Sequence, residues 1–241
     1  MKLTNRLKVI ASLVPGESIV ADIGTDHGYL PIYLLKNNDV RHVYATDVNR
    51  GPLQAAKEFV TENKELKRVD LILGDGLSCV KEKDVDGAVI AGMGGILIQE
   101  IIQRDFDKAK ALSWMILQPM TAPEKLREYL MQNGFEIIRE ELAKEQRRIY
   151  QIMLVKFTGE STNYQNSFYY HIGEKNVKEN HPLAGEMIEQ YKEKQQKILR
   201  KCEEKTTPTT QKRIEEVLAL LRQIEEVEQD YANGKNTGHV E

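Results

Sequence analysis

The segment Asp22-Ile23-Gly24-Thr25-Asp26-His27-Gly28 carries the clearest chemical signal in the sequence. It directly follows a short apolar run, where a buried strand would pass into a helix. Gly24 lets the backbone turn tightly, and Gly28 lets a ligand or the next helix approach closely. The N–H groups at the start of the helix would then face a ligand. The alternative is a glycine-bearing turn that binds nothing.

The glycine spacing in this segment argues against a dinucleotide. The pattern is G-x-x-x-G, whereas dinucleotide-binding turns have G-x-G-x-x-G. Asp26 stands where such a turn would place glycine near a pyrophosphate, and its negative charge would repel phosphate. A carboxylate at this place suits a cationic ligand without phosphate, such as the sulfonium and amino groups of S-adenosylmethionine. A nicotinamide oxidoreductase is therefore disfavoured.

Two further acidic residues follow the next two apolar runs. Asp47 lies 23 residues after Gly24, a separation typical of an acid that accepts hydrogen bonds from ribose hydroxyls, although a helix N-cap aspartate is the alternative. Asp75 lies in Gly74-Asp75-Gly76-Leu77, where it could accept the adenine amino group while Leu77 packs on the ring. A plain Asp-Gly turn would explain the same four residues.

Glycines and an amide follow the fourth and fifth apolar runs. The segment Ala91-Gly92-Met93-Gly94-Gly95 would let backbone touch a ligand or a flat base, and Met93 offers an adaptable apolar surface. A hinge before the next helix is the alternative. Gln118-Pro119 could add amide contacts or form only a turn. All these segments follow consecutive runs, and open α/β sheets bind ligands at the carboxyl ends of their strands.

The elements that must position these residues alternate between strands and helices. Apolar runs of this kind are typical of parallel strands covered by helices on both faces. The last two runs follow each other without a helix, which indicates a hairpin. We therefore expect an α/β fold with a Rossmann-like class I methyltransferase sheet, mostly parallel with an antiparallel edge strand. The predicted strands are 18–23, 42–47, 69–73, 87–91, 114–117, 135–142 and 149–157, and the predicted helices are 28–36, 52–64, 95–104 and 122–133.

The character of the sequence changes in its last third. Residues 158–181 have no clean period and indicate a loop or short linking helix. Beyond them, apolar residues recur at helical spacing on both sides of a Thr/Pro cluster at 206–210, which predicts an antiparallel, coiled-coil-like helical hairpin. The final residues, 233–241, are expected to fray. We thus expect a catalytic domain at 1–157 and a linker with its hairpin at 158–241. The stripes are Leu183, Met187, Tyr191, Ile198 and Cys202, then Ile214, Val217, Leu221 and Ile224.

Composition limits the possible partners. The net charge is −3 with a pI near 6.0, which excludes a bulk-basic nucleic-acid binder but not a local basic face. Residues 192–213 predict such a face, with eight Lys or Arg against three acids, although a solvated coiled-coil surface is the alternative. Arg6, Lys8 and Arg147-Arg148 are other candidates for contacts with phosphate. The two cysteines lie far apart, so we expect no metal site. The sequence shows no signal peptide or membrane span, which predicts a cytoplasmic protein.

Together these motifs resemble the bacterial tRNA (adenine-22-N1)-methyltransferases, often called TrmK. The resemblance covers nearly the whole chain, including the order of a Rossmann-like domain and a C-terminal hairpin. It is carried by residues 21–31, Thr46-Asp47-Val48-Asn49, Gly74-Asp75-Gly76-Leu77, Gly92-Met93-Gly94-Gly95 and Leu117-Gln118-Pro119. The Asp-His-Gly-Tyr-Leu-Pro and Gly-Met-Gly-Gly runs are its specific parts, since many methyltransferases share the aspartates.

The resemblance implies methyl transfer from S-adenosylmethionine to N1 of an adenine in the D-arm of tRNA. We expect tRNA as partner, no membrane, no obligate protein partner and a monomer, although the hairpin stripes could also pair between chains. Arg6 is expected among the substrate contacts, but it could instead close over the cofactor. The expected cofactor residues are Asp22, Ile23, Gly24, Asp26, His27, Gly28, Asp47, Val48, Asn49, Asp75, Gly76, Leu77, Ala91 and Gly92. The expected substrate residues are Met93, Gly94, Gln118, Pro119, Arg6, Lys197, Arg200 and Lys201.

The implied chemistry needs positioning more than proton transfer. N1 of adenine has an in-plane lone pair, so no base must deprotonate it, and in-line placement becomes the main requirement. The ring gains positive charge, which a fixed carboxylate would stabilise. Asp26 is the candidate, with Tyr29 as a hydrogen-bonding or stacking helper, although Asp26 could instead bind the cofactor's ammonium or cap the helix. The rival functions are methylation of another RNA or a small molecule, and a non-catalytic cofactor-binding module.

Overall fold

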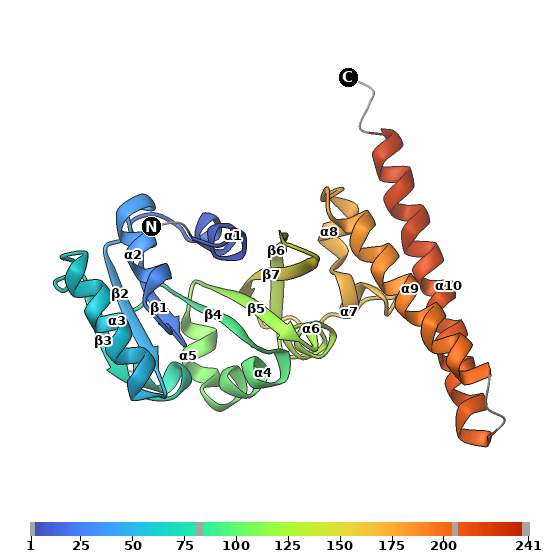
Figure 1. Ribbon diagram of the computed structural model, residues 1–241, viewed down its shortest axis with the longest axis horizontal. Helices are drawn as coiled ribbons and strands as arrows, with labels where there is room; N and C mark the ends of the chain where they lie inside the picture. Colours follow the sequence, from blue (N-terminus) through green and yellow to red (C-terminus); the bar gives the residue numbers. More distant parts are fainter. Residues whose placement is uncertain (1–2, 81–83, 204–206, 238–241) are drawn as a thin grey trace. The chain divides into compact units, whose positions relative to one another are not determined.

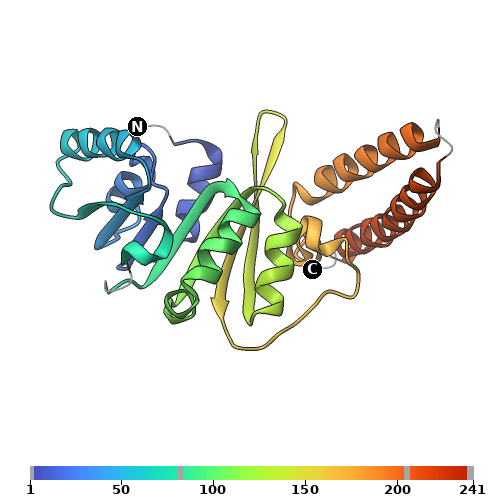
Figure 2. The same cartoon turned by 90° about the horizontal axis from the view of Figure 1, so that it is seen from below.

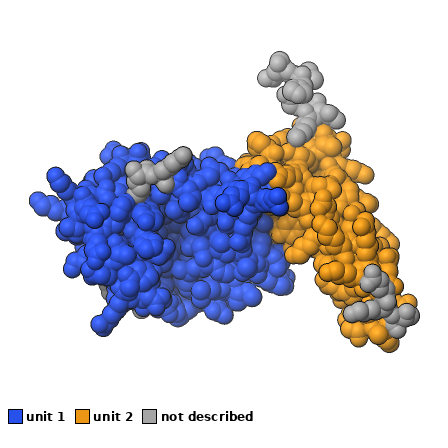
Figure 3. All heavy atoms as spheres, viewed as in Figure 1, with its two compact units in different colours: residues 1–163 blue, residues 164–241 orange. Residues whose placement is uncertain are grey.

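The chain forms two compact units, which Figure 3 colours separately. The computed structural model describes residues 3–80, 84–203 and 207–237, and the units meet at Asn163 and Tyr164. This boundary lies six residues beyond the expected one. The reason is local: the Thr158 and Gly159 N–H groups donate to the Gly134 carbonyl at 2.9 and 3.0 Å, which ties the segment back to the first unit.

In the described part of the first unit, seven strands form one sheet in the order β3-β2-β1-β4-β5-β7-β6 (Figure 1). The first five strands pair in parallel, and β7 pairs antiparallel with both β5 and β6. The predicted mostly parallel sheet with a final hairpin is confirmed, but the strand that runs against all the others is β7, which lies between β5 and β6 and not at the edge. The strands are β1 Ile19–Ile23, β2 His42–Asp47, β3 Val69–Leu73, β4 Gly87–Gly94, β5 Trp114–Thr121, β6 Phe135–Glu145 and β7 Arg148–Phe157.

The glycine-rich segment after residue 91 is part of a strand. Strand β4 pairs with β5 as far as Met93 opposite Pro119 and Gly94 opposite Thr121, with a register shift on each side of Met93. Helix α4 then starts at Gly95. The hinge interpretation of this segment is therefore wrong, because both of its ends are fixed by backbone pairing.

In the part of the first unit that the structure describes, six α-helices connect and cover these strands. Four of them match predicted helices closely, whereas α1 and α5 were not predicted. Helix α1 starts after Thr4, whose Oγ1 accepts the Leu7 N–H at 3.4 Å, and it buries Ile10 and Leu13. The helices are α1 Asn5–Leu13, α2 Tyr29–Asn37, α3 Arg50–Glu62, α4 Gly95–Arg104, α5 Phe106–Ala111 and α6 Pro123–Gln132.

The strand order reverses between β1 and β4. Successive strands run outward through β2 and β3 on one side, and from β4 to β5 on the other. Because parallel crossovers are right-handed, the helices of the two runs fall on opposite faces of the sheet (Figure 2). The contacts agree, since α1 and α3 touch α2 while α5 and α6 touch α4. Ligands bind at such a reversal point in open α/β sheets.

The described elements of the second unit are all helices, and turns connect them. Its long helices are antiparallel, because the Lys192 ammonium lies 2.6 Å from the Glu228 carboxylate while Gly185 packs against Tyr231. Helix α10 continues to Thr237, so residues 233–237 of the segment expected to fray are helical, and its residues 238–241 lie outside the described residues. Coiled-coil packing stays a prediction. The helices are α7 Tyr169–Ile172, α8 Glu174–Lys178, α9 Ala184–Glu203 and α10 Pro208–Thr237.

The predicted apolar stripes meet within this unit. Met187 on α9 and Val217 and Ile224 on α10 are buried, and the two helices contact each other. The stripes therefore meet inside one chain, with their other residues partly exposed. Throughout the described chain, no helix is long and apolar enough to cross a membrane.

Candidate active site at the carboxyl edge of the sheet

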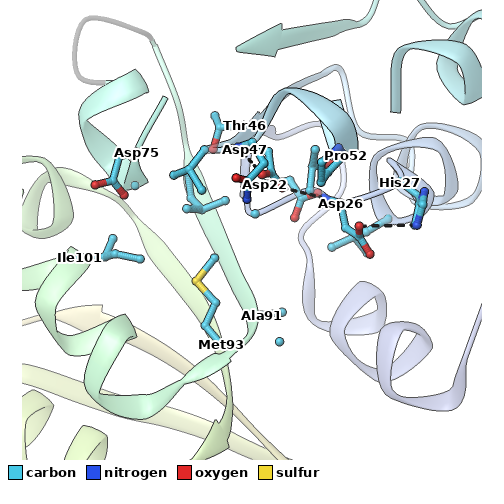
Figure 4. A pocket seen from close by; sticks show the side chains of 18 of the residues that line it. Asp22, Asp26, His27, Thr46, Asp47, Pro52, Asp75, Ala91, Met93 and Ile101 are labelled. Carbon is cyan, nitrogen blue, oxygen red and sulfur yellow. Dashed lines mark hydrogen bonds and ion pairs between the residues drawn. The ribbon is translucent and has the colours of Figure 1, made fainter. Parts of the chain in front are cut away.

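A cavity of about 650 Å³ opens at the carboxyl ends of β1 to β4, where the strand order reverses (Figure 4). Helices α1 and α4 and the first turns of α2 and α3 complete its wall. The structure thus brings together residues that span most of the first hundred positions. The predicted site residues that line the cavity are Arg6, Asp22, Ile23, Gly24, Asp26, His27, Tyr29, Asp47, Val48, Asn49, Asp75, Gly76, Ala91, Gly92 and Met93.

The turn after β1 owes its shape to two glycines in the left-handed region, Gly24 at φ +78° and Gly28 at φ +72°. A Cβ on Gly24 would lie 2.4 Å from the Met93 Cε, so the two strand ends meet directly. Gly28 faces Ala56 of α3, whose Cβ would lie 3.3 Å away, and it does not line the cavity. Gly28 was predicted to bind cofactor; it instead lets two helices approach.

Asp22 is the buried carboxylate of the site, with only 4% of the residue exposed. Its pKa is raised from 3.8 to about 6, mainly because burial removes hydration and also because of the nearby charge of Asp47, against a hydrogen bond with Thr25 that lowers it. The ionised form is therefore costly here unless a cation approaches. A buried carboxylate of this kind is a strong recognition element for a positively charged ligand.

Asp47 orders the ends of β1 and β2. Its Oδ1 accepts the Asn49 N–H at 2.8 Å and its Oδ2 accepts the Asp26 N–H at 3.4 Å. Asn49 is the N-cap residue of α3 by backbone position, and its side chain makes no capping bond. Asp47 therefore does not serve as that cap, and its carboxylate faces the cavity.

Asp26 lies at the opposite end of the cavity from Asp75 (Figure 4). It has a left-handed backbone at φ +54°, which aspartate tolerates better than most residues. Its side chain is 70% exposed and lies 3.6 Å from the His27 Nε2. The N-cap of α2 is Gly28, without a side-chain bond, so Asp26 does not cap that helix.

Tyr29 presents an aromatic surface at the same end. The residue is 43% exposed and its ring meets Phe59 edge-to-face at 5.0 Å, with His27 at 5.4 Å on another side. These neighbours hold the ring while leaving part of it accessible from the cavity.

The end of the cavity near Asp75 differs from the prediction in one residue. Leu77 is fully buried and does not line the cavity, so it cannot pack on a bound ring. Ile101 of α4 lines the wall there instead. Ile101 falls at the helical spacing of the other buried residues of α4, so nothing in the sequence indicated that it would line the cavity.

Gln118 lies behind the cavity and ties two of its walls together. The residue is fully buried, and its Oε1 accepts the Gly92 N–H at 3.1 Å and an Arg6 Nη1 donor at 2.6 Å. Its Nε2 donates to the Pro119 carbonyl at 2.9 Å. Gln118, Pro119 and Gly94 were predicted to touch substrate, but none of them lines the cavity. Gln118 acts by holding Arg6 there.

Charge is distributed unevenly over the cavity. Among its described lining residues stand four carboxylates and one guanidinium, that of Arg6. Such a surface attracts cations and repels phosphates. In the described residues, no group of three or more His, Cys, Asp or Glu could hold a metal ion. The carboxylates are Asp22, Asp26, Asp47 and Asp75.

In the second unit, basic residues gather on one face of α9. Lys197 and Lys201 line a hollow of about 330 Å³ together with Lys194, while Arg200 is exposed but outside it. Lys197 forms an ion pair with Glu193 at 3.3 Å, which leaves the local charge positive. Lys205, which belongs to the predicted basic face, lies outside the described residues.

Comparison with known proteins places this geometry in a family. The methyltransferase-domain family matches residues 3–153. A tRNA (adenine(22)-N(1))-methyltransferase of Bacillus subtilis is 33% identical over 156 residues, which span 65% of this chain and 66% of that enzyme.

Solved structures resemble the chain over more of its length. The B. subtilis m1A22 tRNA methyltransferase TrmK superposes with a TM-score of 0.84 at 27% identity, over 94% of this chain and 99% of that one. M. capricolum TrmK, solved with S-adenosyl-homocysteine, gives a TM-score of 0.82 at 28% identity, over 96% and 100%. The likeness thus includes both units.

Proposed function

The chain belongs to the methyltransferase-domain family and, within it, to the bacterial tRNA (adenine-22-N1)-methyltransferases, and from this premise we propose that it transfers the methyl group of S-adenosylmethionine to N1 of adenine 22 in tRNA. One observation carries the proposal from the site itself. Four carboxylates surround a cavity at the reversal point of the sheet, and the cavity runs from a buried aspartate to a glycine-rich strand end.

The residues present fit this cofactor. Asp22 and Gly24 would hold the methionine end, because a buried carboxylate matches its ammonium group and the turn leaves room for it. Asp47 would accept the ribose hydroxyls. Asp75 would accept the adenine amino group, with Ile101 against the ring. The scarcity of cations agrees with a ligand that has no phosphate.

When bound, the cofactor supplies a methyl group already activated by its sulfonium. The protein then has to place adenine N1 in line with that group and stabilise the positive charge that the ring acquires. Met93 and Gly92 border the space for the base. Asp26 is our candidate for charge stabilisation, and the accessible ring of Tyr29 is a surface on which a base could stack. A paired base would first have to leave its stack.

The tRNA would be held by the basic face of α9, here defined as Lys194, Lys197, Arg200 and Lys201. Lysine contacts to phosphate position RNA without reading its sequence. We further propose that the protein acts as a monomer in the cytoplasm, since its hairpin stripes meet within one chain and its substrate is a cytoplasmic RNA.

The central test is product analysis. The protein is incubated with methyl-labelled S-adenosylmethionine and an unmodified tRNA transcript, and the digested nucleosides are separated. Label should appear in 1-methyladenosine, and a transcript with guanosine at position 22 should remain unlabelled. Label in another nucleoside, or in the guanosine-22 transcript, would contradict the proposed target. Cofactor binding without any transfer would instead support a non-catalytic module.

The role of α9 is tested separately. Changing Lys194, Lys197 and Lys201 to Gln should weaken tRNA binding and reduce the slope of log affinity against log salt by about 2 to 3, if each lysine neutralises one phosphate. A control with the same charge change uses the exposed residues Lys57, Lys64 and Lys67 of the first unit. Equal effects of the two triple variants would refute a specific role for α9.

A further inference from the structure

Arg104, the last residue of α4, grips the loop that carries Asp75. Its Nη1 lies 2.5 Å from the Asp75 Oδ2, and its Nη2 donates to the Asp75 backbone carbonyl at 3.2 Å. One guanidinium thus fixes both the side chain and the backbone of the same residue. Neither contact could be expected from the sequence, because the two residues are 29 positions apart.

The neighbouring residue strengthens this attachment. Asp105 accepts the Ser78 N–H at 3.1 Å and lies 3.4 Å from the Arg104 Nε. Hydrogen bonding to Asp75 raises the pKa of Arg104 above its ordinary value, so the guanidinium stays charged at any working pH. The segment from Asp75 to Ser78 is therefore anchored to the end of α4 at three points.

Arg104 also closes the space behind Gly76. A Cβ added to Gly76 would lie 2.4 Å from the Arg104 Nη2 and 3.0 Å from the Ile101 Cγ2, and the residue has φ +61°. Arg104 itself does not line the cavity. It stands behind the wall, so any effect on a ligand must pass through Asp75 and Gly76.

The contact with Arg104 orients the Asp75 carboxylate. Its side chain is 60% exposed and would otherwise sample several rotamers. Arg104 engages Oδ2, which leaves Oδ1 to accept a hydrogen from a ligand. The guanidinium also offsets one negative charge in a cavity that contains three other carboxylates. A carboxylate oriented in this way accepts from an amino group and repels a carbonyl oxygen.

We propose that Arg104 is a positioning residue that gives the site its preference for a 6-amino purine over a 6-oxo purine. The proposal rests on the proposed function, because it takes the Asp75 end of the cavity as the adenine site. Arg104 does not touch the ligand; its two-point grip holds Asp75 in the orientation that accepts the 6-amino group. Loss of these two contacts lowers the preference for 6-amino over 6-oxo purines more than it lowers the affinity for purine ligands as a class.

The test compares two ligands by calorimetry, S-adenosyl-homocysteine and S-inosyl-homocysteine, which differ at the 6-position of the purine. Wild type should prefer the adenosyl compound by about 100-fold, since the inosyl compound places a carbonyl oxygen, which cannot donate a hydrogen bond, where the 6-amino group donates to Asp75. In Arg104→Gln this ratio should fall about tenfold, because the carboxylate must be ordered on binding. Arg104→Lys keeps the charge but not the two-point grip, and the ratio should fall there too.

Arg41→Gln is the matched control, because Arg41 pairs with Asp86 at the amino ends of the central strands, whereas the cavity lies at their carboxyl ends. It should leave the ratio unchanged. An equal loss of affinity for both ligands in Arg104→Gln, or an unchanged ratio in Arg104→Lys, would overturn the positioning role. Failure of the wild type to bind S-adenosyl-homocysteine would overturn the proposed function instead, so the two failures are distinguishable.

Discussion

Asp22→Asn should stabilise the ligand-free protein while weakening its hold on the cofactor. The buried carboxylate has a pKa of about 6 in the folded chain against 3.8 ordinarily, because burial removes its hydration. Above pH 6 the group is ionised in both the folded and unfolded states, and the folded state bears the cost of the buried charge. An amide of the same shape carries no charge and avoids that cost.

The expected magnitude follows from the two pKa values. Their difference corresponds to about 3 kcal/mol at pH 7, at about 1.4 kcal/mol per pKa unit. The sign reverses the usual aspartate case: the cost falls as pH drops through 6, because the folded state takes up a proton before the unfolded state does. The gain from the Asp22→Asn change should therefore be about 3 kcal/mol at pH 7, about 1.5 at pH 5 and about 0.5 at pH 4.

Urea denaturation followed by tryptophan fluorescence measures this gain for the first compact unit, which contains Asp22. Trp114 is the single tryptophan of the chain and lies buried in β5, beside the strands that form the cavity. The difference between variant and wild type at each pH cancels the contribution of every other titrating group. Asp26→Asn is the control, because its side chain is 70% exposed and its removal should change stability little at any pH.

Two results would refute this reasoning. One is an Asp22→Asn variant no more stable than wild type at pH 7, and the other is a gain that stays constant from pH 7 to pH 4. The binding side is checked by calorimetry with S-adenosylmethionine. Wild-type affinity should fall as Asp22 is protonated below about pH 6, whereas the affinity of the Asp22→Asn variant should be weak and nearly independent of pH.

Three further predictions concern other parts of the first unit. Asp26→Ala should keep S-adenosylmethionine affinity within about tenfold yet lose most turnover; equal losses in calorimetry and initial rates would assign Asp26 to cofactor holding. Arg127→Met should lower the free energy of unfolding by about 3–5 kcal/mol, because it strips a fully buried Glu140 of its ion pair at 2.7 Å. A chain with both residues made apolar should recover much of that loss in urea denaturation, and no recovery would contradict the explanation. Arg148→Ala should weaken tRNA binding more than Arg147→Ala in filter binding, since Arg148 is held over an aromatic ring at 4.9 Å and bonded to a backbone carbonyl; equal effects would contradict this.

The strands and the main site loops were predictable because their signals are local. A buried parallel strand is a short apolar run, and the turn that follows it needs glycine or a polar residue at a fixed offset. Asp22 and Asp47 lie at the carboxyl ends of their strands and Asp75 lies in the turn after β3, and all three line the cavity. The topology then brings them together without any further information from the sequence.

The remaining site residues depend on packing between distant segments. Arg6 reaches the cavity through a bond to a residue 112 positions away, and Arg104 reaches the Asp75 loop across 29 positions. Leu77 shows the opposite error, since a leucine after a glycine turn reads the same whether it faces a ligand or the core. A local pattern specifies that a loop is present, whereas tertiary contacts decide which of its side chains face inward.

The contacts of Arg6 and Arg104 suggest why the cavity keeps an excess of negative charge. Arg6 and Arg104 offset part of the charge of four carboxylates, yet among the described residues no cation lowers the pKa of the buried Asp22. A binding site neutralised in full would be more stable empty and would gain less from a cationic ligand. Leaving Asp22 uncompensated makes the folded chain about 3 kcal/mol less stable at pH 7, and the ammonium group of the cofactor is the cation that would remove that cost. When the methyl group moves, positive charge passes from the cofactor's sulfur to the target adenine and stays in the cavity that the four carboxylates line. The feature that weakens the empty protein is thus the one that favours its charged reactants.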